Sequence, residues 1–190
     1  MPKALQVQPL LISETRVRFG LALGEILKLT SPKASNMSST QLQDTADKLA
    51  VVETLYRFAA GIDLRDEVLL ASAFTEDAIS DFRPAAAKAG FEYPVLQGRQ
   101  TIVAALSGSL AGIDTTHSVN NPRVSIAGDQ AQVDALVEAQ HVPQNDHSRH
   151  YLMKNRYDVK LVRAGDAWLI QSVTVDNVWR TGEPGVLSGV

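Results

Sequence analysis

The 190-residue sequence contains no cysteine. This absence excludes disulfide bonds, thiolate nucleophiles and cysteine-ligated metal sites. It is compatible with a reducing compartment, and we expect a cytoplasmic protein. The sequence also lacks an apolar run of about 18 residues, so we expect no transmembrane helix and no membrane partner. Basic residues are not in excess, because the net charge is −3, and we therefore expect no nucleic-acid partner.

The hydrophobic content of 45% is enough for one globular domain with a core. Residues 1–36 differ from the rest, because charged residues break their apolar run and leave no core for a signal peptide. Residues 31–36 read as a linker, and Met37 follows them as an alternative start. We therefore expect a poorly packed extension over 1–36 and the folded domain over 37–190.

The first half of the domain has a helical pattern. Apolar residues recur every three or four positions from Asp44 to Ile62, which predicts a helix with Asp44 as its N-cap. A second helix is expected over 65–74, a turn over 75–77 and a short strand over 79–83. Residues 84–97 contain Pro84, Gly90 and Pro94 and are interpreted as a loop that covers a pocket. A third helix is expected over 99–110.

The second half has the pattern of a β-meander. Strands are expected around His117 and over 130–142, 150–163 and 167–180, with Gly128-Asp129 and Gly165-Asp166 as hairpin turns. Apolar residues alternate with polar ones in the strands 130–142 and 150–163, and we expect their odd-numbered residues to face one interior. The last strand is apolar on both faces, so its orientation is left open. Helices followed by an antiparallel meander indicate an α+β fold.

Asp63 and His117 are candidates for catalysis. Asp63 closes the first helix, where the helix dipole disfavours a carboxylate, so a partner for it is expected. A carboxylate beside an imidazole makes a general base with a fixed tautomer. The alternative is a structural histidine with satisfied hydrogen bonds. His141, Asn155 and Tyr157 are polar residues on otherwise apolar strand faces, where they could contact a ligand.

Short motifs in a fixed order cover roughly residues 41–182, and together they resemble the SnoaL-like branch of the NTF2-like superfamily. They are Tyr56-Arg57-Phe58, Gly61-Ile62-Asp63, Phe74-Thr75-Glu76-Asp77-Ala78, Gly98-Arg99, Thr116-His117 and Gly165-Asp166-Ala167-Trp168-Leu169-Ile170. The resemblance implies a cone-shaped curved sheet wrapped around helices, with a pocket at its open end. It also implies a homo-oligomer, for which we expect a dimer through the outer face of the sheet.

In this family, scytalone dehydratase and hexachlorocyclohexane dehydrochlorinase place a catalytic Asp and His at positions that match Asp63 and His117. His141 matches a second catalytic histidine of the dehydratase. Asn155, Tyr157, Phe82 and Tyr56 are expected to bind substrate. The chain departs from its relatives at Ile62 and Phe82, where the dehydratase has tyrosines, and at Val173, where the dehydrochlorinase has an arginine.

The resemblance therefore implies a cofactor-independent lyase or isomerase acting on a small, partly apolar substrate, cyclic compounds included. A non-catalytic ligand-binding module, or a small structural subunit like that of ring-hydroxylating dioxygenases, is the alternative. His141, His147 and His150 lie within ten residues, which raises the alternative of a metal site. Their spacing matches no zinc signature, and we expect none.

Overall fold

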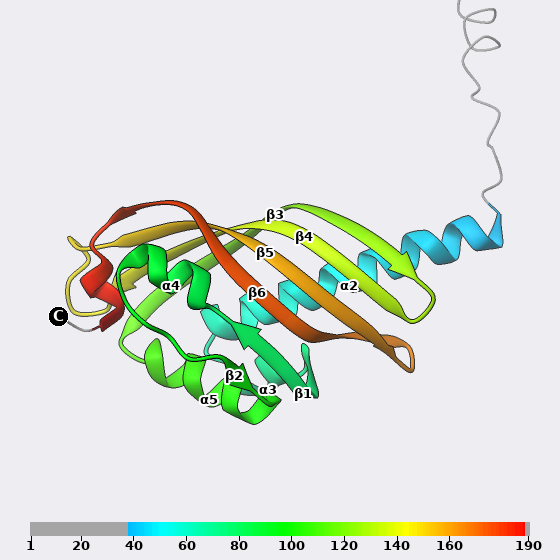
Figure 1. Ribbon diagram of the computed structural model, residues 1–190, viewed down its shortest axis with the longest axis horizontal. Helices are drawn as coiled ribbons and strands as arrows, with labels where there is room; N and C mark the ends of the chain where they lie inside the picture. Colours follow the sequence, from blue (N-terminus) through cyan, green and yellow to red (C-terminus); the bar gives the residue numbers. More distant parts are fainter. Residues whose placement is uncertain (1–37, 189–190) are drawn as a thin grey trace, which may run out of the picture. The chain divides into compact units, whose positions relative to one another are not determined.

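The computed structural model describes residues 38–188, so the expected extension over 1–36 and the alternative start at Met37 lie outside the described part. The described chain forms a curved, six-stranded sheet in the order β2-β1-β6-β5-β4-β3, with helices before it and between its first strands (Figure 1). The expected α+β fold is confirmed. None of the helices between residues 38 and 188 is long and apolar enough to cross a membrane.

The elements follow one another along the chain with few long connections. The helices are α2 (Ser39–Asp63), α3 (Glu67–Ala71), α4 (Arg83–Ala89), α5 (Arg99–Ser109) and the 3-10 helix η1 (Pro184–Ser188). The strands are β1 (Phe74–Asp81), β2 (Leu96–Gln97), β3 (Ile113–Ala127), β4 (Gln130–Pro143), β5 (Tyr151–Ala164) and β6 (Ala167–Gly182).

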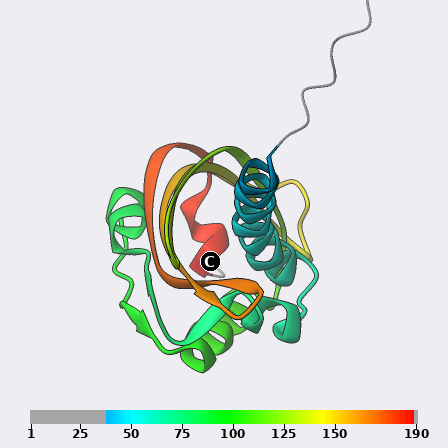
Figure 2. The same cartoon turned by 90° about the vertical axis from the view of Figure 1, so that its right-hand side faces the viewer.

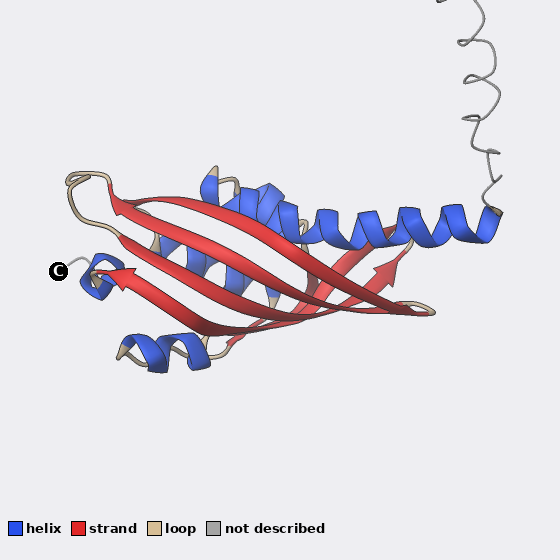
Figure 3. Cartoon of the chain, turned by 90° about the horizontal axis from the view of Figure 1, so that it is seen from above, coloured by secondary structure: helices blue, strands red, loops and turns tan. Residues whose placement is uncertain are grey.

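Helix α2 packs along the inner, apolar face of the sheet (Figure 3). Its Phe58 ring lies with its centroid 5.0 Å from that of Phe74 and 6.1 Å from that of Tyr157. Seen end-on, the strands curl around an interior (Figure 2). The short helix η1 lies at the end of the sheet beside the C-terminus (Figure 1), where its Val186 is buried and joins the core.

The expected faces of β4 and β5 are confirmed. The odd-numbered residues from Ala131 to His141 and from Tyr151 to Leu161 are buried, and they lie opposite one another in the antiparallel register. Two-residue hairpin turns join β3 to β4 and β5 to β6, with Gly128 at φ 60° and Gly165 at φ 64°. Glycine adopts this left-handed conformation without steric cost, as such turns require.

Strand β6 changes its buried face part-way along, which is why its periodicity gave no orientation. Leu161 pairs with Ile170, but the neighbouring Lys160 pairs with Ser172, so Gln171 is an extra residue in a bulge. The buried residues before the bulge are even-numbered, and those after it are odd-numbered. Val178 and Trp179 are exposed, and self-association through this outer face stays a prediction.

Several expectations for the helical half were wrong. Helix α2 begins at Ser39 rather than after Asp44. Its first turns are exposed and carry no apolar pattern, so the apolar periodicity did not reveal them. The second helix is shorter than 65–74, since Arg65 adopts φ 54° and Asp66 caps α3. Residues 75–77 are not a turn but part of β1, because this segment adds to the sheet beside β6 despite its acidic composition.

Residues 84–97 were expected to be a loop, but they contain most of α4 and all of β2. Pro84 lies in the first turn of α4, where its missing N–H has no helical partner to lose. Gly90 ends α4 at φ 90°, a left-handed helix cap. The third helix, expected over 99–110, is confirmed as α5.

Gly61 marks a close approach of two helices. A Cβ atom at this position would lie 2.6 Å from the Leu70 Cα of α3. We expect Gly61→Ala to destabilise the domain by about 1–3 kcal/mol, because backbone cannot move aside easily. The matched control is Gly108→Ala in α5, where a Cβ would meet nothing within 4 Å and better helix propensity should stabilise slightly. Urea unfolding of both variants measures the difference; equal effects would contradict it.

Candidate active site

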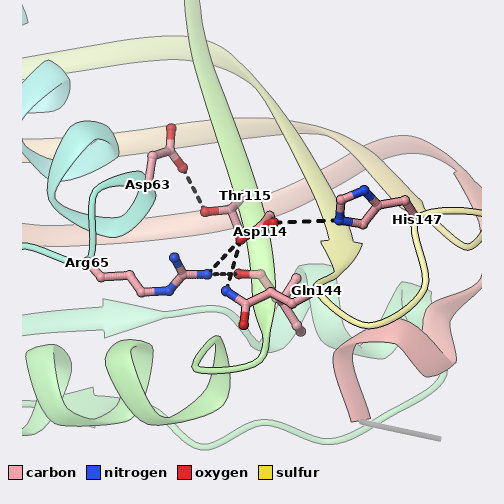
Figure 4. A network of polar contacts seen from close by, with 7 residues as sticks. Asp63, Arg65, Asp114, Thr115, Gln144 and His147 are labelled. Carbon is pink, nitrogen blue, oxygen red and sulfur yellow. Dashed lines mark hydrogen bonds and ion pairs between the residues drawn. The ribbon is translucent and has the colours of Figure 1, made fainter.

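Asp63 and His117 lie in direct contact where α2 meets β3. The His117 ring nitrogen Nδ1 is 2.6 Å from Asp63 Oδ1, and the His117 backbone N–H donates to Oδ2 at 2.7 Å. The Thr115 hydroxyl donates to Oδ1 at 2.8 Å (Figure 4). Three donors from one strand therefore hold this carboxylate at the end of the helix.

These contacts fix the charge of Asp63 and the tautomer of His117. Burial alone would raise the pKa of Asp63, but the hydrogen bonds and charge of His117, with the Thr115 bond, lower it below its usual value. Because the carboxylate is then an acceptor, His117 Nδ1 carries the proton that it receives. In this neutral tautomer the other ring nitrogen, Nε2, carries the lone pair. The His117 side chain is only 6% exposed.

Arg65 joins the end of α2 to the start of β3. Its guanidinium donates to the Ile113 carbonyl at 2.8 Å and to Asp114 Oδ1 at 2.9 Å (Figure 4). Gln144 donates to the same carboxylate oxygen at 3.0 Å. The left-handed conformation of Arg65 allows the chain to turn out of α2 directly after Asp63. The network therefore fixes the two elements that carry Asp63 and His117.

His141 lies on β4 beside His117, with the ring centroids 6.0 Å apart. Its Nδ1 is 3.1 Å from the Tyr151 carbonyl oxygen, which can only accept, so Nδ1 carries the proton. Burial, followed by the charge of His117, lowers the pKa of His141 to about 4. His141 is therefore neutral at neutral pH, and its Nε2 is a hydrogen-bond acceptor.

A cavity of about 240 Å³ lies next to the two histidines. Most of its wall is apolar, and none of its lining residues within 38–188 is Asp, Glu, Lys or Arg. Burial raises the pKa of Tyr157, so its hydroxyl stays protonated and can donate. The lining residues come from α2, α4, α5, four strands, η1 and the segment after α4: Ile62, Phe82, Ala85, Ala86, Phe91, Tyr93, Leu106, Ser109, Leu110, His117, Ala139, His141, Met153, Asn155, Tyr157, Val175 and Leu187.

Comparison with known proteins identifies the family. The model of the SnoaL-like domain family matches residues 43–174. The chain belongs to the SnoaL-like domain family. It is 32% identical to the "Terrestric acid biosynthesis cluster protein E" of Penicillium crustosum over 145 residues, which are 73% of this chain and 87% of that protein.

Solved structures share the fold of this SnoaL-like domain at low identity. A putative aromatic ring hydroxylase from Novosphingobium aromaticivorans has a TM-score of 0.64 and 23% identity, over 74% of this chain and 96% of that one. A putative scytalone dehydratase from the same organism has a TM-score of 0.63 and 17% identity, over 74% of this chain and 89% of that one. At this identity the likeness establishes the fold and not the reaction.

The structure brings most of the expected site residues of the SnoaL-like domain together. His117, His141, Asn155, Tyr157 and Phe82 line the cavity, and Asp63 lies behind His117. Ile62, one of the departures from the dehydratase, also lines it, whereas Val173 is buried in the core. The segment 84–97 covers the cavity as expected, through α4 and the residues that follow it.

Tyr56 was expected to bind substrate, but it does not line this cavity. It is 42% exposed, because the α2 positions that face the interior are Leu55, Phe58 and Ile62. Thr115 was not among the expected site residues, although it lies two residues before His117 and therefore on the same face of β3. His147 and His150 lie outside the cavity, and the described chain contains no group of three or more acidic or histidine side chains that could hold a metal ion.

Proposed function

We propose that this SnoaL-like protein is a cofactor-independent lyase or isomerase, with His117 as general base and Asp63 as the residue that orients it. One observation carries the proposal: the 2.6 Å contact between Asp63 and His117 beside an apolar cavity. A carboxylate behind the imidazole stabilises the charged ring that forms when Nε2 takes a proton.

The reaction that fits is an elimination from a neutral β-hydroxycarbonyl compound. His117 Nε2 removes a proton from the carbon next to the carbonyl, and the C–H electron pair moves onto the carbonyl oxygen. Asn155 and the Tyr157 hydroxyl donate hydrogen bonds to that developing oxyanion. The electrons then return to form the carbon–carbon double bond, hydroxide leaves, and the proton on His117 converts it to water. No electron acceptor is needed.

The known relatives support this choice in different degrees. The Penicillium protein is named after a biosynthesis cluster for an organic acid, which fits a small-molecule substrate. The putative scytalone dehydratase is named for an elimination of water, whereas the putative ring hydroxylase is named for another chemistry. Because proteins named for two different reactions share this fold, the proposal rests on the Asp63–His117 pair and not on the fold.

Deuterium exchange tests the proposal. The protein is incubated in heavy water with β-hydroxyketones of one ring and of two fused rings, while enone absorbance and deuterium at the α-carbon are followed. We expect exchange, elimination or both with the wild-type chain, and neither with His117→Ala. His147→Ala, which changes an exposed histidine, is the matched control. If the wild-type chain binds these compounds without exchange, the ligand-binding alternative replaces the proposal.

A further inference from the structure

Asn155 and Asn177 form a buried pair of amides between β5 and β6. They are 4% and 2% exposed, and Asn177 Nδ2 donates to Asn155 Oδ1 at 2.9 Å. Asn155 lines the cavity, whereas Asn177 does not. Asn177 therefore lies one layer behind the cavity wall and acts on it through Asn155.

The surroundings of Asn177 allow one orientation of its amide. Its Nδ2 also faces the carbonyl oxygens of Lys154 at 3.3 Å and Trp179 at 3.0 Å, which can only accept. Its Oδ1 accepts from Arg180 NH1 at 3.3 Å, which can only donate. The flipped amide would oppose oxygen to two carbonyl oxygens and an amino group to a guanidinium, with several buried groups left unpaired.

The orientation of Asn177 sets that of Asn155. Because Asn177 presents an amino group, Asn155 must turn its Oδ1 toward it, and its own amino group points the other way. Within residues 38–188 that amino group has no acceptor, and Asn155 is part of the cavity wall. Because this donor belongs to the cavity wall, a ligand with an acceptor that binds there gains a hydrogen bond.

We propose that Asn177 is a positioning residue, which holds the Asn155 amino group in the cavity and thereby selects neutral ligands with a carbonyl oxygen. The ligand is neutral because the described part of the chain places no Asp, Glu, Lys or Arg in the cavity wall, and burying an unpaired charge is costly. The inference rests on the proposed function only in taking the cavity as the ligand site. It does not require His117 to act as a base.

Two probes of the same carbon skeleton test the proposal: α-tetralone, which carries a carbonyl oxygen, and tetralin, which does not. In Asn155→Leu we expect the affinity for tetralone to fall about tenfold relative to that for tetralin, the effect of one neutral hydrogen bond. In Asn177→Asp we expect Asn155 to turn its amino group to the new carboxylate. The affinity for tetralone should then fall by a similar factor. The affinity for α-tetralol should rise, because its hydroxyl can donate to the Asn155 oxygen that now faces the cavity.

Controls separate this inference from the proposed function. His117→Ala should lose turnover but keep the preference for tetralone, and Asn120→Ala, which removes an exposed asparagine of β3, should change neither. A measurement on the wild-type chain covers the case in which Asn177→Asp does not fold. The side-chain amide resonances of Asn155, identified by their absence in Asn155→Leu, should shift with tetralone and not with tetralin.

Three results would overturn the proposal. The first is equal responses of the Asn155 amide to both probes. The second is a folded Asn177→Asp variant with the wild-type ratio of affinities. The third is a wild-type chain whose cavity takes up neither probe at millimolar concentration.

Discussion

His117→Ala and Asp63→Asn are each expected to lower kcat by about 10²–10⁴-fold for a substrate that undergoes the elimination, the usual loss for a positioned base. His117→Ala removes the nitrogen that takes the proton. Asp63→Asn replaces a charged acceptor by an amide that stabilises the imidazolium less and can hold the wrong tautomer. Both variants should fold, as thermal melting and circular dichroism will check.

The double variant should be little slower than the slower single variant, because a base and the residue that orients it act as one unit. Thr115→Val should have a smaller effect, since it removes one of three donors to the Asp63 carboxylate. His147→Ala should behave like the wild-type chain. Normal turnover by His117→Ala would refute the assignment, and strictly additive losses would refute the pairing.

Val133→Asp is expected to leave the domain largely unfolded at room temperature. Val133 is 0% exposed near the start of β4, opposite Val159 of β5. An unpaired charge there costs several kcal/mol, against a total stability of about 5–15 kcal/mol for a typical domain. Loss of the cooperative melting transition, or a large shift of the urea midpoint, measures the effect.

The adjacent position provides the matched control. Gln132 is exposed on the other face of the same strand and lies opposite Lys160, so Gln132→Asp should change stability by less than about 1 kcal/mol. A folded Val133→Asp protein with a stability near that of Gln132→Asp would show that the interior of the sheet accepts charge at this point.

The parts of the fold that the sequence predicted are those with local patterns. β4 and β5 alternate strictly because one face packs on α2 and the other meets solvent, and their turns carry glycine where the backbone needs it. Asp63 and His117 were found for a similar reason. The local sequence is enough to recognise a carboxylate at the end of a helix, and it is enough to recognise the family motif around Thr116-His117.

The parts that were missed depend on contacts between distant residues. The bulge at Gln171 inverts the faces of β6, and it hides Asn177 on a strand that is apolar on both sides. The strand expected over 79–83 overlaps only the last residues of β1, which begins at Phe74 because β6 lies beside it, not because of its composition. The hydrogen bond from Arg65 to the Ile113 carbonyl joins the end of α2 to the start of β3, and the sequence does not show that these two elements are neighbours.

The strand order has a consequence for how the protein is made. β6, the last strand along the chain, is a central one, and it separates β1 from β5. At about 5–20 residues per second, β1 leaves the ribosome several seconds before its partner does. During that interval the edge of β1 can pair with other nascent chains. The yield of folded protein in a cell will therefore fall when the concentration of incomplete chains is high, and it will rise when chaperones protect them, even though the finished domain is stable.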